Sequence, residues 1–127
     1  MAKSAVELVS EAKQDIENLT PQQVAAELSA GNVTLIDIRE SEEQKISGKI
    51  NGSILAPRGM IEFYADPTLP SYKPAFDKDK RIILHCASGG RSALAVQTLK
   101  RMGYENIAHL NGGLKAWAEA GYPVEKE

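Results

Sequence analysis

Short apolar runs and longer amphipathic stretches alternate along the chain. Four apolar runs have the length and β-branched content of buried strands, at residues 33–38, 53–56, 82–84 and 106–110. Apolar positions three and four residues apart, as in Ala95, Leu99 and Met102, mark an amphipathic helix. Strands that alternate with helices predict an α/β fold, a mostly parallel sheet with helices on both faces.

Capping residues delimit the predicted helices. Thr20, Pro21 and Gln23 are typical of a helix start, and Gly31 ends that helix. The predicted helices cover residues 3–17, 20–30, 40–46, 93–102 and 114–120, with one or two further turns in 58–64. Residues 66–74 hold three prolines and predict an irregular surface connection.

The chain of 127 residues is long enough for one domain with its own core. We assign residues 1–15 to an N-terminal helical extension and residues 16–127 to the domain proper. Apolar positions at helical spacing in the extension predict packing against the domain, with a dimer contact as the alternative. For the whole chain, a monomer and a weak dimer both remain open.

The composition narrows the class of protein and its surroundings. The formal charge of -2 predicts no nucleic-acid partner and no anionic membrane. One cysteine excludes an internal disulfide, and no segment resembles a signal peptide or a membrane span. We therefore expect a cytoplasmic protein. With two histidines and one cysteine, no zinc site can be assembled, and we expect neither a metal nor a cofactor.

The only cysteine, Cys86, directly precedes a loop of small and polar residues between a predicted strand and a predicted helix. The loop consists of Ala87, Ser88, Gly89, Gly90, Arg91 and Ser92. Such a loop turns its backbone N–H groups toward one point, where the helix dipole is also positive. The pattern predicts an anion site with Cys86 at its mouth and a thiol pKa below the usual value of about 8.5.

Activation of the thiol alone would contribute little. A fall of about two pKa units raises the thiolate fraction at pH 7 about 25-fold, but lower nucleophilicity removes roughly 6–10-fold of that gain. We therefore expect the loop to act mainly by binding an anionic donor or by stabilising a charged cysteine intermediate. The competing interpretation is that Cys86 is a buried and inert core residue.

The segment Cys86-Ala87-Ser88-Gly89-Gly90-Arg91 resembles the Cys-x-x-Gly-x-Arg active-site loop of rhodanese-like sulfurtransferases. Further segments resemble motifs of that family in the same order, over residues 16–125. They are Asp37-Ile38-Arg39, Gly48-Lys49-Ile50-Asn51-Gly52-Ser53, Pro57-Arg58-Gly59, Leu110-Asn111-Gly112-Gly113, Ala116-Trp117 and Gly121-Tyr122-Pro123-Val124. Lys49 stands where the family often has histidine, and we expect that segment to be structural.

The resemblance implies a five-stranded rhodanese-like fold and a sulfurtransferase. Cys86 would take a sulfane sulfur from thiosulfate or a low-molecular-weight persulfide and pass it to cyanide, a small thiol or a sulfur-acceptor protein. The loop amides would stabilise the persulfide. Arg91 would either meet an anionic donor or brace the loop against a carboxylate. Ser88 and Ser92 would donate hydrogen bonds, unless Ser92 only caps the helix.

Three further positions are accessory candidates. We expect Asp37 and Arg39 to form a structural ion pair rather than to act in catalysis. Arg58 either faces the pocket and attracts an anion or is an ordinary surface charge. Strand alternation directs His85 away from Cys86, so we interpret it as a core histidine, and Trp117 as a core residue with a bonded indole N–H.

Two other classes of function stay open at this point. A thiol-based phosphatase or arsenate reductase has five residues between its cysteine and arginine, whereas this chain has four. The shorter loop, by up to about 3.5 Å of contour, suits a single sulfur atom better than a phosphate. A non-catalytic rhodanese-like interaction module is the other alternative, although inactive modules often lack the cysteine.

Overall fold

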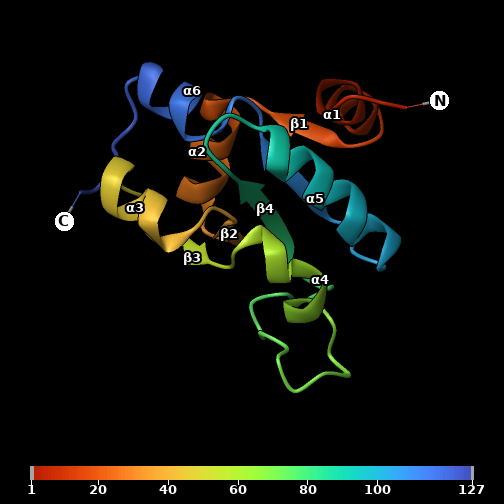
Figure 1. Ribbon diagram of the computed structural model, residues 1–127. Coiled ribbons are helices and arrows are strands. Elements are labelled where there is room, and N and C mark those ends of the chain that lie inside the picture. Colours follow the sequence, from red (N-terminus) through yellow and green to blue (C-terminus); the bar gives the residue numbers. More distant parts are fainter. Residues whose placement is uncertain (1, 127) are drawn as a thin grey trace.

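A computed structural model describes residues 2–126, and its centre is a five-stranded parallel sheet (Figure 1). The strand order is β1-β5-β4-β2-β3, and every pairing is parallel. The strands are β1 (Glu17–Leu19), β2 (Val33–Asp37), β3 (Ile54–Leu55), β4 (Arg81–His85) and β5 (Ile107–Leu110). The predicted α/β class with a five-stranded sheet is confirmed. Residue 1, which begins the predicted N-terminal extension, and residue 127, which ends the predicted domain, lie outside the described residues.

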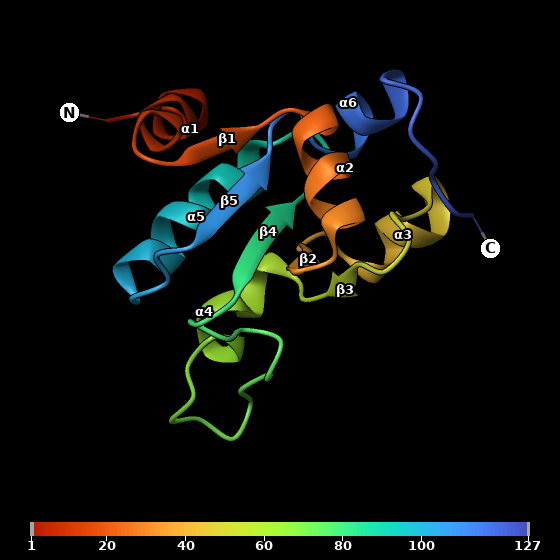
Figure 2. The ribbon, with the colours of Figure 1, turned by 180° about the vertical axis from the view of Figure 1, so that it is seen from behind.

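Helices cover both faces of the sheet, as Figures 1 and 2 show from opposite sides. The helices are α1 (Ala5–Gln14), α2 (Pro21–Ala30), α3 (Ser41–Ser47), α4 (Ile61–Tyr64), α5 (Gly90–Arg101) and α6 (Gly113–Glu119), with a 3-10 turn, η1, at Arg58–Met60. Helices α4 and α5 pack on one face, with α1 beside α5, and α2 and α6 pack on the other. None of the helices in residues 2–126 has the length and hydrophobicity that a membrane crossing requires.

The central strand β4 shows how the apolar pattern builds two cores. Ile82 and Leu84 point to the face of α5, whereas Ile83 points to the face of α2 and α6. All three are at most 1% exposed, and burying each such side chain stabilises the fold by about 1.5–3 kcal/mol. Cys86 continues the alternation on the α5 face. The strand therefore directs the cysteine side chain toward the start of α5.

The N-terminal helix is shorter than its periodicity predicted. It ends at Gln14 instead of residue 17, and Glu17–Leu19 forms the edge strand β1 beside β5. Pairing with Ala108–Leu110 supplies these backbone groups with partners, and this tertiary contact overrides the local helical pattern. The Lys100 ammonium donates to the Asp15 carbonyl at 2.8 Å and helps to end the helix there.

Helix α5 begins at Gly90, three residues before the predicted start at residue 93. Gly89 is its N-cap residue and has a left-handed backbone, with φ 100°. The residues Gly90, Arg91 and Ser92 therefore form the first helical turn. The backbone N–H groups in the first turn of a helix have no acceptor within the helix, so these amides are available to another group.

Candidate active site around Cys86

Cys86 lies at the carboxyl end of β4, where the chain turns directly into α5. Its Sγ accepts hydrogen bonds from the Gly89 amide at 3.2 Å and from the Ser92 amide at 3.4 Å. Backbone donors and the positive end of the α5 dipole thus meet at the sulfur atom. This arrangement stabilises negative charge on the sulfur or on an atom bound to it.

The cysteine is buried, in contrast to its expected place at the mouth of the loop. Cys86 is 1% exposed and belongs to the core on the α5 face. The sulfur therefore forms the floor of the loop, and the loop backbone covers it. A sulfur donor has to be small, or has to present its sulfur at the end of a narrow group, in order to reach Sγ.

The loop is held from outside by the start of α6. The Leu114 amide donates to the Cys86 carbonyl at 2.9 Å, and the Lys115 amide donates to the Ala87 carbonyl at 3.0 Å. These two bonds hold the carbonyls of Cys86 and Ala87 from outside, while the Gly89 and Ser92 amides point to the sulfur. The turn after β5 is therefore part of the machinery that shapes the site.

Two glycines permit this close approach. A Cβ on Gly113 would lie 2.6 Å from both the Ala87 carbonyl oxygen and the Cys86 carbonyl oxygen. A Cβ on Gly89 would lie 2.9 Å from the Gly112 amide nitrogen. No side chain fits between the two backbones at these distances. Packing of the loop against the α6 turn thus explains Gly113 and Gly89, whereas a Cβ on Gly112 would meet the Cβ of Ala116 within α6.

Arg91 braces the loop against α3. Its Nη1 and Nη2 donate to the two carboxylate oxygens of Glu43, both at 2.8 Å. The bonds from Arg91 hold the pKa of Glu43 at about 2, below its ordinary value of 4.5. Of the two roles expected for Arg91, this geometry is that of the brace, because both ends of the guanidinium fork are engaged.

Asp37 and Arg39 form a buried pair below the loop. Arg39 is 1% exposed; its Nη2 donates to Asp37 Oδ2 at 2.9 Å and to the Gly48 carbonyl at 2.7 Å. Burial raises the pKa of Asp37, but bonds from Arg39 and Gln44 outweigh it, so the pKa lies below its usual range. The pair connects the ends of β2 and α3, and Arg39 also lines the groove beside the loop.

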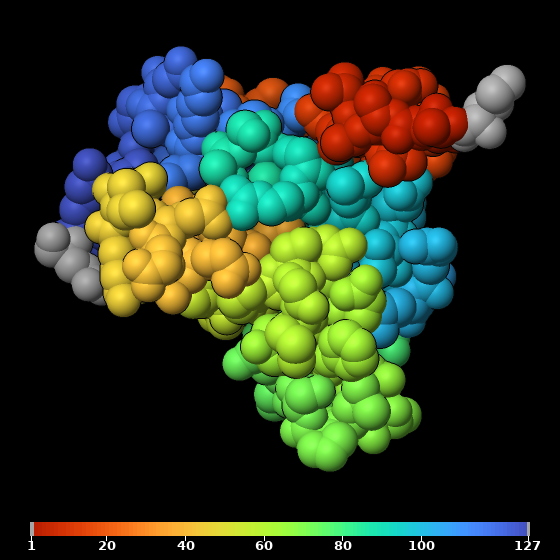
Figure 3. All heavy atoms as spheres, in the orientation of Figure 1, coloured from red at the N-terminus to blue at the C-terminus, as the bar shows by residue number. Residues whose placement is uncertain are grey.

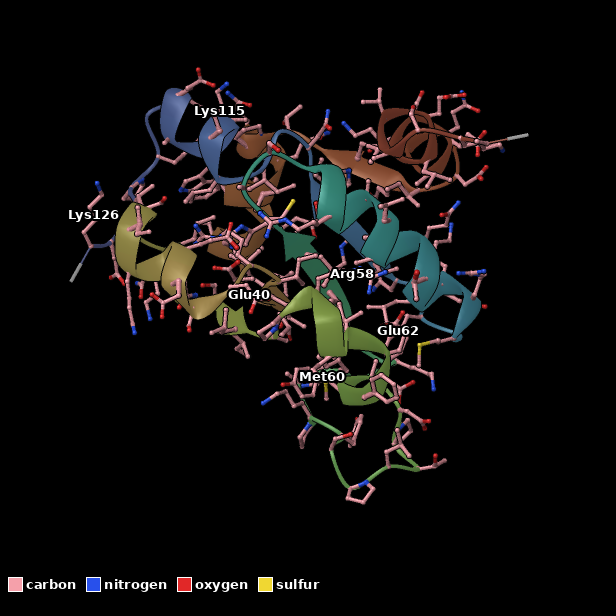
Figure 4. All side chains as sticks on the ribbon, in the orientation of Figure 1. Glu40, Arg58, Met60, Glu62, Lys115 and Lys126 are labelled. Carbon is pink, nitrogen blue, oxygen red and sulfur yellow. The ribbon has the colours of Figure 1, made fainter. Side chains whose placement is uncertain are left out.

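Arg58, the third accessory candidate, bonds to residues of α4 and α5, and the two expected core residues, His85 and Trp117, are buried. Arg58 donates to Glu62 at 3.2 Å and to Thr98 at 3.5 Å, and Figure 4 shows it between α4 and α5. His85 is fully buried, with its Nδ1 3.3 Å from the Cys86 carbonyl oxygen, and burial lowers its pKa. Trp117 is buried and its indole N–H donates to the Pro123 carbonyl, as predicted.

The two serines of the loop have different surroundings. Ser88 lines a surface hollow together with Gly90 and α1. Ser92 is fully buried and is not the helix cap; its Oγ lies 3.5 Å from Cys86 Sγ and 2.8 Å from Nδ1 of His109. No motif in the sequence pointed to a functional role for His109. Only the register of β5 beside β4 brings this residue to the loop.

A groove of about 360 Å³ borders the loop at Ala87, between α3 and α6. Its lining also includes Leu114 and Val124, with the ammonium-bearing residues Lys115 and Lys126. Figure 3 shows the loop region, in teal, on the same face as α3, α6 and α1. The lining also holds Arg39 and Glu43, whose charges are paired with Asp37 and Arg91. The groove thus combines an apolar surface with two ammonium groups, as a small organic anion requires.

The fold and the loop together define the class of this protein. The sequence profile of the rhodanese-like domain matches residues 20–120. The chain therefore belongs to the rhodanese-like domain family.

Similar proteins include sulfurtransferases and a protein of unknown function. A sulfurtransferase of Allochromatium vinosum is 32% identical over 93 residues, which are 73% of this chain and 78% of that protein. A probable adenylyltransferase/sulfurtransferase of Mycobacterium tuberculosis is 33% identical over 107 residues; the match covers 83% of this chain and 25% of that protein's length. A solved structure from Rhodopseudomonas palustris, of unknown function and described as a possible tyrosine phosphatase, has a TM-score of 0.92 and 41% identity and covers 98% of this chain and 96% of that chain.

Proposed function

We propose that this protein is a sulfurtransferase that carries a sulfane sulfur on Cys86 as a persulfide. The observation that carries the proposal is the pair of amides, of Gly89 and Ser92, directed at the sulfur of the only cysteine. They lie in a loop with four residues between Cys86 and Arg91, in a chain of the rhodanese-like family. Such a loop stabilises one anionic sulfur atom.

The transfer takes place in two steps. The Cys86 thiolate attacks the sulfane sulfur of thiosulfate; a new S–S bond forms, the donor S–S bond breaks, and sulfite leaves with the bonding electrons. An acceptor thiolate or cyanide then attacks the outer sulfur and regenerates the Cys86 thiolate. Charge is conserved in both steps, and each product leaves before the next substrate reacts, so ping-pong kinetics are expected. The loop amides and the α5 dipole stabilise the persulfide anion between the steps.

The surroundings of the loop favour a small anionic donor and an external acceptor. Lys115 and Lys126 give the adjoining groove positive charge, which suits thiosulfate or a carboxylate-bearing persulfide. The chain has no second cysteine to take the sulfur from Cys86, so the acceptor is a separate thiol or protein. We place this chemistry in the cytoplasm, where thiols remain reduced.

A phosphatase is the second candidate, because the Rhodopseudomonas palustris protein is described as a possible tyrosine phosphatase. A phosphatase loop needs its arginine to grip the phosphate oxygens. Here Glu43 holds both ends of the Arg91 guanidinium. This contact favours sulfur transfer over phosphate hydrolysis.

The two candidates are separated by paired assays on the purified protein. Thiosulfate, glutathione persulfide and mercaptopyruvate are each supplied with cyanide, and thiocyanate is measured; an aryl phosphate is supplied in parallel. We expect thiocyanate from at least one donor, parallel double-reciprocal lines, and no activity in Cys86→Ser. Hydrolysis of the aryl phosphate without thiocyanate would replace this proposal with a phosphatase, and neither activity would favour an interaction module.

A further inference from the structure

A chain of buried polar groups leads away from Cys86 through the sheet. Cys86 Sγ lies 3.5 Å from Ser92 Oγ, and Ser92 Oγ lies 2.8 Å from His109 Nδ1. His109 Nε2 lies 2.7 Å from Asn18 Oδ1. Asn18 and His109 are register partners in β1 and β5. Cys86, Ser92 and His109 are each at most 1% exposed, so these three groups are shielded from water, whereas Asn18 at the outer end is exposed.

The outer end of the chain fixes the positions of its protons. The Asn18 side-chain Nδ2 donates to the carbonyls of Lys13 at 2.9 Å and of Ile16 at 3.1 Å. Its Oδ1 therefore faces His109 as an acceptor, and His109 Nε2 must carry a hydrogen. In the neutral ring Nδ1 is then an acceptor, so the Ser92 hydroxyl donates to it.

The Ser92 hydroxyl thereby presents lone pairs to the cysteine. Its other available acceptor, the Gly89 carbonyl, is at 3.4 Å, much farther than His109 at 2.8 Å. With the hydroxyl proton directed at His109, Ser92 Oγ accepts from the Cys86 thiol. In this arrangement each polar group from Cys86 to Asn18 has a hydrogen-bond partner. The thiol proton points to Ser92, which in turn donates to His109.

We propose that Ser92 relays the thiol proton of Cys86 to His109 when the sulfur becomes a nucleophile. The S–H bond breaks and its proton binds Ser92 Oγ, while the original hydroxyl proton moves to His109 Nδ1. The sulfur keeps the electron pair, and no oxidant or reductant is involved. The product state holds a thiolate that accepts from the Ser92 hydroxyl and an imidazolium that donates to Ser92 and to Asn18. His109 is a positioning residue, because it acts on the sulfur through Ser92.

The surroundings of His109 leave its ring free to receive the proton. Burial, assisted by the charge of Lys13 on α1, lowers the pKa of His109 to about 4, so the ring is neutral at pH 7. The neighbouring groups are otherwise uncharged: Asn18 from β1, Ser92 from α5 and the register partner Leu84 from β4. The same burial opposes formation of the imidazolium, so the transfer depends on the thiolate that forms in the same step across Ser92 and supplies the opposite charge.

The relay depends on a part of the chain that lies outside the matched family profile. The profile covers residues 20–120, whereas Asn18 and the α1 residue Lys13 precede it. The N-terminal helix therefore orients the last amide of the chain of hydrogen bonds. The inference rests on the proposed sulfur chemistry at Cys86 but adds a feature of its own: the proton stays inside the protein.

Retention of the proton has a signature in the pH dependence of the reaction. A thiolate paired with an imidazolium has the same total number of protons as the neutral pair, so its population does not change with pH. The reaction rate of Cys86 is then level between about pH 5 and 7, below the ordinary ionisation range of a thiol. If the thiol instead has to release its proton to water, the reaction rate falls about tenfold for each unit by which the pH is lowered.

The test uses methyl methanethiosulfonate, a small reagent that transfers a methylthio group to a thiolate and releases methanesulfinate. Its reaction with the single cysteine is followed by intact mass from about pH 5 to 9. In the wild type we expect a level rate over the acidic half of this range. Two variants should lose the level profile: Ser92→Ala, and His109→Asn, which keeps an acceptor but takes no proton. In both, the rate over the acidic half should fall about tenfold for each unit by which the pH is lowered. Ser92→Thr restores the level profile because it retains the hydroxyl.

A wild-type rate that falls tenfold per unit, or a level rate in His109→Asn, would overturn the relay while leaving sulfur transfer by Cys86 in place. No reaction of the native protein at any pH would contradict the relay and the proposed function together. A second measurement needs no variant. Nitrogen NMR of the two histidine rings at pH 7 should show His109 protonated at Nε2 only; the opposite tautomer would exclude the relay.

Discussion

At the scale of single residues, His109 shows how burial links the site to stability. Its pKa is about 4 in the folded protein against an ordinary value of 6.5. As the pH falls below 6.5, the unfolded chain binds the proton first, so stability is lost progressively down to about pH 4. Above 6.5 the contribution is fully present, since both states then carry a neutral ring.

This linkage predicts a pH-dependent difference between the wild type and His109→Asn. Between pH 7 and 4.5 the wild type should lose about 2 kcal/mol more unfolding free energy than the variant. Urea denaturation at the two pH values measures it. His85 is present in both proteins, so its own contribution cancels. Equal losses in the two proteins would show that His109 titrates normally in the folded state.

The Arg91–Glu43 pair makes a second prediction at this scale. Glu43→Gln removes the carboxylate that holds Arg91, so the loop should loosen and sulfur transfer should slow severalfold. Stability should fall by about 1 kcal/mol or less, because both side chains are partly exposed. The Glu43 contribution is present above pH 4.5 and is lost as the pH falls through about 2.

The matched control is Glu42→Gln, one residue earlier in α3. Glu42 pairs with Lys45 at 3.6 Å at a site where both side chains are largely exposed, and its replacement should leave transfer unchanged. Thiocyanate formation measures both variants. If Glu43→Gln instead transferred sulfur faster with anionic donors, Arg91 would be a donor-binding group that the carboxylate restrains.

At the scale of elements, the contact between the loop and the start of α6 is decisive. Gly113→Ala places a Cβ 2.6 Å from two loop carbonyl oxygens and has to separate the loop from α6. Gly52→Ala is the control, because Gly52 also has a positive φ, 85°, but has nothing within 4 Å. The control should lose about 1–2 kcal/mol from backbone strain.

Gly113→Ala should lose at least about 2 kcal/mol more than Gly52→Ala, because backbone atoms cannot move aside cheaply. It should also react more slowly at Cys86. Chemical denaturation and thiocyanate formation measure the two effects. Equal stability losses in the two variants would mean that the loop tolerates separation from α6.

The helices and strands also show how much of this fold local sequence patterns predict. The strands near residues 33–38 and 106–110 and the helix cap at Thr20 follow from local pattern and are present as predicted. The edge strand β1 does not, because its three residues gain their structure only by pairing with β5. Likewise, α5 starts early because Gly89 supplies a left-handed cap that apolar periodicity does not register.

The same limit applies to the site. The sequence alone points to Cys86 and its loop, because strand, loop and helix are neighbours in the chain. Glu43 on α3 and His109 on β5 reach the loop, and Asn18 on β1 reaches His109; only the folded chain brings these distant segments together. The burial of Cys86 also depends on the whole fold, because loop and core cover it from different segments.

For the whole molecule, the buried sulfur predicts discrimination by size. Cys86 is 1% exposed, so a bulky aromatic disulfide should label the native protein more slowly than methyl methanethiosulfonate does. After each rate is divided by the rate of the same reagent with free cysteine, the difference should be at least about tenfold. In denaturant the difference between the protein and free cysteine should vanish. Labelling kinetics at one pH measure this. Equal relative rates in the native protein would mean that the loop opens freely.

The most direct test of the account is the intact mass of the protein after exposure to a sulfur donor. Thiosulfate, glutathione persulfide and mercaptopyruvate are applied in turn, the excess donor is removed, and the protein is weighed before and after addition of cyanide. We predict a gain of about 32 Da, one sulfur atom, located on Cys86, absent in Cys86→Ala and removed by cyanide. An unchanged mass with all three donors, or a gain that persists in Cys86→Ala, would contradict sulfur transfer through this cysteine.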